Sequence, residues 1–175
     1  IEAGTTISWS VKHEADVVIA PSEISMLLDN GEEFGTNVKV SSAKAITVNA
    51  TFNTPLYKKK TVVDNYNQLT INFKEDYGII LRAYDDGVAY RFFSNKKGMV
   101  TILSEEANFN FDKDYTTLIP YVRDLRGTEQ YIQSYEALYT KQTISKVYND
   151  TLGFLPVLVN EGKKKAVILE ADLVD

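Results

Sequence analysis

The sequence predicts an all-β protein, and three observations support that prediction. Apolar and polar residues alternate with the two-residue period of a half-buried strand, most clearly over residues 7–12 and 68–73. Aromatic residues, which favour strands, are frequent, with eleven Tyr and eight Phe. Residues 81–93 place two runs of aromatic and branched residues around Asp85-Asp86-Gly87, a pattern typical of a β-hairpin.

The N-terminal part of the chain is expected to consist of strands separated by turns. The expected strands cover residues 7–12, 17–19, 24–28 and, with a weaker pattern, 38–48. Pro21-Ser22 is interpreted as a break between the second and third strands, and Asp29-Asn30-Gly31 as the turn that ends the third. The basic run Lys58-Lys59-Lys60 suggests either an anion-binding patch or a solvated turn, and the turn is favoured because lysines discourage edge pairing.

The central hairpin allows a prediction of register. A two-residue loop would set Arg82 directly opposite Arg91, and opposed like charges are unfavourable. A three-residue loop over Asp85-Asp86-Gly87 places Arg82 opposite Tyr90 instead, with Gly87 in the left-handed conformation that glycine reaches without penalty. The sequence therefore favours the three-residue loop.

Beyond the hairpin, residues 94–98 form a turn signal, and apolar residues near 100–102 and 109–111 suggest two further strands. Residues 120–140 fit two interpretations, a short helix with tyrosines at helical spacing or a tyrosine-rich loop that packs on a neighbour. A last hairpin is expected from Leu155 to Val159 and from Ala166 to Leu173, joined by Asn160-Glu161-Gly162. With 175 residues and no visible linker, a single domain over residues 1–175 is expected.

Composition excludes several classes of function. A net charge of −5 argues against a nucleic-acid partner, because phosphate binding needs concentrated Lys and Arg. The absence of cysteine excludes disulfides and thiolate metal sites. No run is long and apolar enough to span a bilayer. The sequence opens on Ile1 without a signal peptide, which suggests a trimmed chain from which an export signal could have been removed.

Few residues are candidates for chemistry. His13, which is the sole histidine, is expected to be an exposed residue at a strand end. Asp85-Asp86 is explained by turn chemistry, and Glu105-Glu106 would point to opposite faces of a strand and so could not act as a pair. Glu170, near Asp172, is a candidate for a cation ligand, although the residues alone favour a salt bridge or a surface carboxylate at a strand end.

Three stretches carry a family resemblance. The hairpin LRAYDDGVAYRFF, the preceding VVDNYNQLTINF and the final ILEADLVD occur in order, and together the chain resembles the N-terminal domain of glycoside hydrolase family 97. The resemblance implies a β-super-sandwich of mostly antiparallel strands that packs against a (β/α)8 catalytic barrel absent from this chain. It also implies a bacterial, exported parent enzyme in the periplasm or associated with the cell envelope.

The resemblance also implies roles for individual residues. The resemblance of the EAD-type segment implies that Glu170 is a calcium ligand at the edge of the active-site pocket, with Asp172 as a second candidate beside it, while the barrel would supply the remaining ligands and every catalytic carboxylate. Arg82 and Arg91 are interpreted as architectural residues that satisfy backbone carbonyls or carboxylates inside the sandwich, and Glu136, in a family-like YE segment with Tyr135, is a candidate partner for one of them.

The function implied is that of a non-catalytic N-terminal domain of a calcium-dependent, exo-acting α-glucosidase or α-galactosidase. Its partners would be its own C-terminal barrel and an oligosaccharide substrate at the domain interface. An alternative from another class is a stand-alone carbohydrate-binding module in which exposed tyrosines and Trp9 stack on sugar rings. A third alternative is an interaction or scaffold domain with no ligand. Its exposed apolar face would resemble the face that the absent barrel leaves uncovered.

Overall fold

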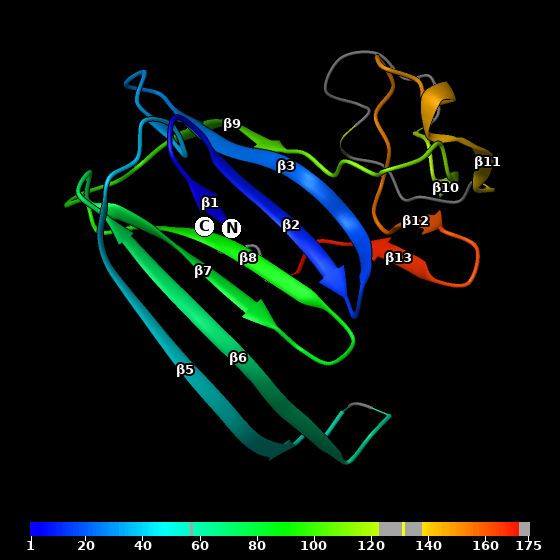
Figure 1. Cartoon of the computed structure of the whole chain (residues 1–175), viewed down its shortest axis with the longest axis horizontal. Helices are drawn as coiled ribbons and strands as arrows, with labels where there is room; N and C mark the ends of the chain where they lie inside the picture. The colour runs from blue at the N-terminus through cyan, green and yellow to red at the C-terminus, as the bar shows by residue number, and fades with distance from the viewer. Residues whose placement is uncertain (57, 123–130, 132–137, 172–175) are drawn as a thin grey trace. The chain divides into compact units, whose positions relative to one another are not determined.

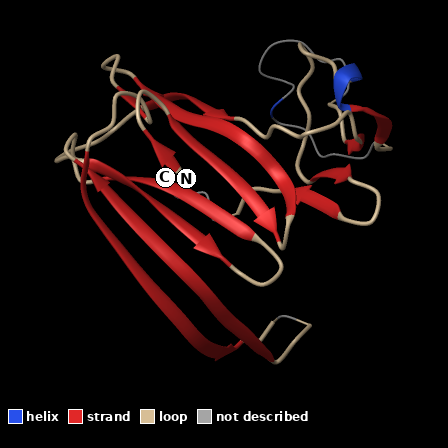
Figure 2. Cartoon of the chain, viewed as in Figure 1, coloured by secondary structure: helices blue, strands red, loops and turns tan. Residues whose placement is uncertain are grey.

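A computed structural model describes residues 1–56, 58–122, 131 and 138–171, and these residues are built mainly of strands. Every strand pairing among them is antiparallel, so the prediction of an all-β sandwich is confirmed (Figure 2). The chain forms two compact units, residues Ile1–Asn110 and Phe111–Asp175. No linker is visible in the sequence at this division, and the single domain expected over residues 1–175 stays a prediction.

The strands are labelled in Figure 1. The first unit contains β1 (Glu2–Ala3), β2 (Ile7–His13), β3 (Asp16–Leu28), β4 (Glu33–Phe34), β5 (Val40–Asn53), β6 (Thr61–Phe73), β7 (Tyr77–Ala83), β8 (Val88–Ser94) and β9 (Ile102–Ala107). The second contains β10 (Thr116–Ile119), β11 (Thr140–Thr143), the 3-10 helix η2 (Ile144–Lys146), β12 (Val157–Asn160) and β13 (Lys165–Ile168).

Two sheets face each other in the first unit. One has the order β1-β2-β3-β4, with β9 also paired to β3, and the other has the order β5-β6-β7-β8 (Figure 1). Aromatic rings join the sheets, since Phe34 of β4 stacks on Tyr77 of β7 at a centroid distance of 4.0 Å, and Trp9 of β2 lies 5.4 Å from Tyr90 of β8. The core therefore forms where the inward residues of the two sheets interdigitate.

The expected break at Pro21-Ser22 is wrong, because β3 runs through it. Trp9 of β2 pairs with Ser22, and Val11 pairs with Ile19, so β3 contains an extra residue at this point. Proline cannot donate a ladder hydrogen bond, and a bulge is one of the few places where a strand accepts it. The Ser22 hydroxyl donates to the Ala20 carbonyl and accepts from the N–H of Asn110, which holds the irregular segment in the sheet.

The central hairpin is present, but its predicted register is wrong. Arg82 lies opposite Ala89, and the Tyr84 N–H donates to the Gly87 carbonyl, so Gly87 pairs with Tyr84 and the loop ends one residue earlier than expected. The φ angle of Gly87 does not fall in the left-handed region. The observed register pairs Leu81 with Tyr90, so apolar side chains share the inner face, and the apolar pattern outweighs the turn signal.

The second unit is a sheet with the order β11-β10-β12-β13. Ile119 and Val159 are among its buried residues. The N–H and hydroxyl of Ser145 in η2 both donate to the Asp114 carboxylate, and these hydrogen bonds lower the pKa of Asp114. The expected last hairpin is present as β12 and β13, and β13 ends at Ile168, while Leu173 lies outside the described residues.

The turn expected at residues 29–31 is confirmed, with Gly31 at a φ of 82°. Lys58-Lys59-Lys60 lies in the loop between β5 and β6, as the favoured interpretation required. Of the two strands expected after residue 98, only β9 forms, and the Phe109–Phe111 segment makes an isolated bridge through Asn110. Most of the ambiguous segment 120–140, including Tyr135 and Glu136, lies outside the described residues.

Candidate functional site

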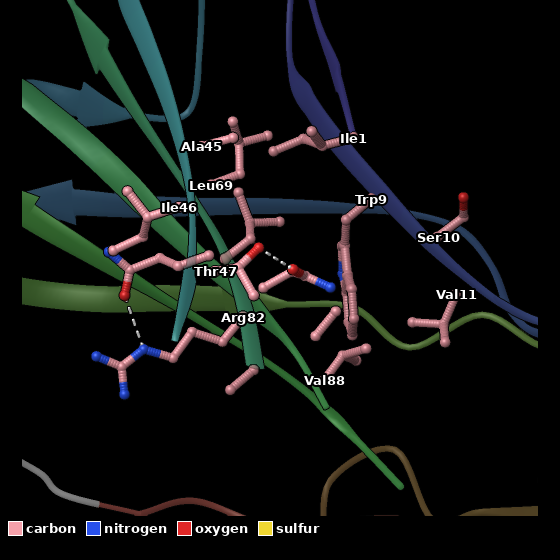
Figure 3. Close-up of a pocket in the computed structure, with 15 residues that line it drawn as sticks. Ile1, Trp9, Ser10, Val11, Ala45, Ile46, Thr47, Leu69, Arg82 and Val88 are labelled. Carbon is pink, nitrogen blue, oxygen red and sulfur yellow. Dashed lines mark hydrogen bonds between the residues drawn. The ribbon is translucent and has the colours of Figure 1, made fainter. Parts of the chain in front are cut away.

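A cavity of about 590 Å³ lies between the two sheets of the first unit (Figure 3). Its lining comes from both sheets and is mainly apolar, including Trp9, Ala45, Thr47, Leu69, Leu81 and Val88. These residues reach one space because β5, β6, β7 and β8 pair in a register that puts Ala45, Leu69, Leu81 and Tyr90 in one cross-strand row. Such a lining, apolar with a few polar groups, is typical of binding sites.

Trp9 forms part of the cavity wall and is 7% exposed. Its ring contacts Tyr90 and also Phe109, at a centroid distance of 5.5 Å in an edge-to-face arrangement. The alternative that Trp9 is an exposed stacking platform is therefore wrong, because its ring is covered by the protein itself. The indole N–H has no acceptor among the described residues. A buried donor without a partner is unfavourable, so this N–H marks a position where a hydrogen-bond acceptor would be stabilising.

Polar residues line the cavity where β5 and β6 extend past β7. The Thr47 hydroxyl donates to the Asn67 side-chain carbonyl over 2.7 Å, joining these strands on their inner face. Sequence reasoning did not single out these two residues. The signal was present, because the inner positions of β6 change from apolar at Leu69 to amide at Asn67 and Asn65. That change shows where the opposite sheet stops covering β6.

Arg82 lies on the outer face of the same sheet. Its Nε donates to the Gln68 side-chain carbonyl over 2.9 Å, and its guanidinium lies 4.4 Å from the centroid of the Tyr66 ring. Figure 3 shows the guanidinium turned away from Trp9. The interpretation of Arg82 as architecture fits this geometry, but its partners include a side-chain amide and an aromatic ring on the outer face, and not the backbone carbonyls or carboxylates that were expected inside the sandwich. Arg91 pairs with Ile80 and is exposed.

Glu170 lies just after β13 and is exposed. Among the described residues, no three His, Cys, Asp or Glu side chains are grouped closely enough to hold a metal ion. A carboxylate is a suitable calcium ligand, but calcium prefers six to eight oxygens. Glu170 therefore fits as one ligand of a site that other residues would complete. Asp172 lies outside the described residues.

The other candidate residues lie apart from the cavity. His13 ends β2 opposite Asp16 and is exposed, as expected. Asp85 and Asp86 lie in the loop of the central hairpin. Glu105 lies on β9 and accepts a long hydrogen bond, 3.5 Å, from the Tyr90 hydroxyl.

The family model described as glycosyl-hydrolase 97 N-terminal matches residues 1–175. The chain belongs to this family. The match confirms the resemblance in the sequence and identifies these residues as the N-terminal domain of a family 97 glycosidase. A curated relative, a retaining alpha-galactosidase from Bacteroides thetaiotaomicron, is 34% identical over 177 aligned residues, which cover 99% of this chain and 27% of that protein.

Solved structures show the same fold for the family 97 domain. A beta-arabinopyranosidase matches with a TM-score of 0.75 and 22% identity, over 89% of this chain and 26% of its own. A family 97 enzyme from a Pseudoalteromonas strain, solved with acarbose, matches with a TM-score of 0.70 and 22% identity, over 89% of this chain and 24% of its own. The chain thus spans about a quarter of the length of these relatives. None of the helices in the described part of the chain is long and apolar enough to cross a membrane.

Proposed function

We propose that this family 97 domain is the non-catalytic N-terminal part of a calcium-dependent, exo-acting α-glucosidase or α-galactosidase. It supports a C-terminal (β/α)8 barrel and walls one side of a pocket for an oligosaccharide. The observation that supports this most strongly is the family match over residues 1–175, together with the 27% of the related alpha-galactosidase that the chain spans. The catalytic carboxylates are assigned to the remainder of the enzyme, so the domain alone is inactive.

Glu170 is proposed to donate a carboxylate oxygen to calcium at the domain interface. Its exposure supports this role, as do the neighbouring apolar side chains Val167 and Leu169, which are 51% and 62% exposed and could contact a further domain. Calcium, when bound, would orient the substrate and neutralise developing charge. The chain's own contribution is one exposed carboxylate held near the end of β13. The parent enzyme is proposed to be bacterial and located in the periplasm or cell envelope.

The first test is the size of the native polypeptide, detected with an antibody against this domain. The domain has a mass of 19.7 kDa, and a barrel adds about 250 residues. A native product larger by at least that barrel supports the proposal. A product near 19.7 kDa would contradict it and leave a domain that works alone.

The second test concerns Glu170 in the natural full-length polypeptide. Glu170→Gln should weaken calcium binding by about tenfold or more in calorimetry, because a charged ligand is lost. Glu106→Gln, at an exposed carboxylate on β9, is the matched control and should leave calcium affinity unchanged. Micromolar calcium binding by residues 1–175 alone would refute a shared site, since one or two carboxylates leave most ligand positions to water.

A further inference from the structure

The sheet β5-β6-β7-β8 has two edges that differ in length and charge. β5 has 14 residues, of which 13 are exposed, and Lys44 is its only charged residue. Among the described residues it pairs only with β6. β8, the opposite edge, has 7 residues and carries Arg91 in its middle. Long edge strands with little charge attract a further strand unless they are covered, so β5 is the edge that lacks protection.

The backbone groups of β5 that point outward can be assigned from the register. The Thr54 N–H donates to the Lys60 carbonyl, and the β5-β6 pairing continues from this pair without a shift to Ser42. Hydrogen-bonded and non-hydrogen-bonded pairs alternate in an antiparallel ladder. Even-numbered residues of β5 from Ser42 onward therefore bond to β6, and the outward N–H and carbonyl groups belong to residues Ala43, Ala45, Thr47, Asn49, Thr51 and Asn53.

The cavity lies along the same edge, because Ala45 and Thr47 are part of its lining. Both side chains are small and point to the inner face of the sheet. A strand paired with β5 would place alternate side chains beside them, at the mouth of the space that Trp9 lines. Strand addition of this kind combines main-chain hydrogen bonds with a recess for alternate side chains. The Trp9 indole N–H has no hydrogen-bond partner among the described residues, so one acceptor in that space would be stabilising.

The surface beyond the cavity supports the same conclusion. β7 pairs with β6 only from Asn67 to Asn72, so residues 48–53 and 61–66 form a two-stranded ribbon that no further strand flanks among the described residues. Phe52 and Val63 on this ribbon are 51% and 63% exposed. Two-stranded ribbons are marginally stable by themselves in water. The ribbon and the edge of β5 together present a site that an added strand would stabilise.

We infer that β5 pairs with a β-strand supplied by the part of the enzyme outside residues 1–175, and that this strand turns apolar side chains and one hydrogen-bond acceptor toward the cavity. The occupant is argued from length, because the chain spans 27% of the related alpha-galactosidase and 24–26% of the solved enzymes, so most of the polypeptide is available to provide it. The inference rests on the proposed function, since it requires a longer native chain.

Hydrogen exchange of the natural full-length polypeptide tests the inference. The outward amides of β5 should exchange about tenfold or more slowly than the outward amides of β8. The β8 amides of Val88, Tyr90 and Phe92 point outward, because the Tyr84 N–H to Gly87 carbonyl bond sets the alternation in that hairpin. β8 is thus a matched edge in the same sheet. Equal exchange at the two edges would overturn the inference.

A pair of variants at one position sharpens the test. Asn49→Pro removes an outward N–H while leaving the ladder to β6 unchanged, whereas Asn49→Ala keeps that N–H and removes only an exposed side chain. Asn49→Pro should raise exchange at the remaining outward amides of β5 about tenfold, and Asn49→Ala should not. Equal exchange in the two variants would contradict strand pairing, and the wild-type comparison stands even if the proline variant folds poorly.

The outcomes of these experiments distinguish a failure of the inference from a failure of the proposed function. A native product of about 19.7 kDa would remove the proposed function and the inference together. A larger product whose β5 amides exchange as fast as those of β8 would remove only the inference. Protection of β5 that disappears on dilution would show pairing with a second copy of the chain, and would overturn the assignment to the same polypeptide.

Discussion

The two ends of the first unit's sandwich differ in how completely the sheets cover each other. At the closed end, formed by Phe34, Phe73, Tyr77 and Phe92, the rings of Phe34 and Tyr77 stack with an interplanar angle of 4°, and Tyr77 is 1% exposed. At the open end, formed by the cavity and residues 48–53 and 61–66, Val63 lies on the inner face of β6 and is 63% exposed. The side chains of the closed end are buried by other residues of this chain. The open end includes exposed apolar side chains, as on a surface that binds a partner.

The difference is encoded along a single strand. The inner positions of β6 are apolar at Phe73, Ile71 and Leu69, and become amides at Asn67 and Asn65. Apolar residues are placed where the opposite sheet removes them from water, and amides where it does not. Val63, an inner position of β6 that is apolar and yet exposed, departs from this rule, which is why the open end is interpreted as an interface.

The largest expected effect is at the closed end. Tyr77→Ala should lower the free energy of unfolding of the 175-residue chain by about 3–5 kcal/mol, because it opens a cavity among three aromatic rings. Phe52→Ala at the open end should change it by no more than about 0.5 kcal/mol, since the side chain is already half in water. Denaturant titration followed by the fluorescence of Trp9, the sole tryptophan, measures both.

The two variants, Tyr77→Ala and Phe52→Ala, also test whether the closed and open ends differ in stability. Similar losses for Tyr77→Ala and Phe52→Ala would mean that the ribbon is part of the cooperative core. A full-length polypeptide in which Phe52→Ala becomes strongly destabilising, while the 175-residue chain tolerates it, would show that a partner covers the open end.

The sequence predicted those features that depend on local pattern. The alternation of Ile7 and Trp9 identified β2, and Gly31 identified a turn, because in both cases neighbouring residues decide the conformation. The register of the central hairpin could not be predicted from its turn residues, since the inner-face pairing of Leu81 with Tyr90 decides it. The sequence likewise did not predict the passage of β3 through Pro21, because a bulge depends on its neighbouring strands.

The candidate site was predictable only in part. Glu170 was selected through its family resemblance, and its exposure after β13 agrees with a ligand for a shared site without testing that role. The cavity was not predicted, because its lining comes from strands far apart in sequence. The alternative function required Trp9 at the surface as a stacking platform, yet burial against Tyr90 and Phe109 gives its ring a structural role.

An intermediate effect on the free energy of unfolding is expected from removing the Tyr77 hydroxyl at the closed end. The Gly35 N–H donates to the Tyr77 hydroxyl over 2.8 Å in a buried position. Tyr77→Phe keeps the ring stack but leaves this N–H without an acceptor, so unfolding should become about 1–3 kcal/mol easier. A loss as large as that of Tyr77→Ala would mean that the hydrogen bond, and not the stacked ring, dominates the closed end.

The difference in stability between the wild type and Tyr77→Phe should depend on pH. Burial raises the pKa of Tyr77 above 10.0, with further contributions from the charges of Glu75 and Glu32, and this outweighs the opposing hydrogen bond from Gly35. The folded state therefore holds the neutral phenol more strongly than the unfolded state does. The resulting stability is fully present below pH 10.0 and is lost as the pH rises through the folded-state pKa. The stability advantage of wild type over Tyr77→Phe should shrink above pH 10.0, measured by denaturant midpoints, and a constant advantage would contradict this.

A smaller effect than that of either Tyr77 variant is expected at Arg82, which lies where β7 stops pairing with β6. Its neighbour Ala83 pairs with Asn67, the last position at which β7 contacts β6, and its guanidinium spans from Gln68 to the Tyr66 ring at the start of the ribbon. Arg82→Lys keeps the charge but loses the planar group that stacks and the fixed hydrogen bond. The expected loss is about 0.5–1 kcal/mol, as for a partly exposed cation–π contact.

A double-mutant cycle of Arg82→Lys with Tyr66→Leu isolates that contact. A coupling free energy of about 0.5–1 kcal/mol would show that Arg82 connects the covered part of the sheet to the ribbon. In hydrogen exchange, the same variant should speed exchange in residues 61–66 while leaving the closed end unchanged. Zero coupling would mean that the ribbon gains no support from Arg82, and that the partner strand inferred for β5 would have to supply all of its stability.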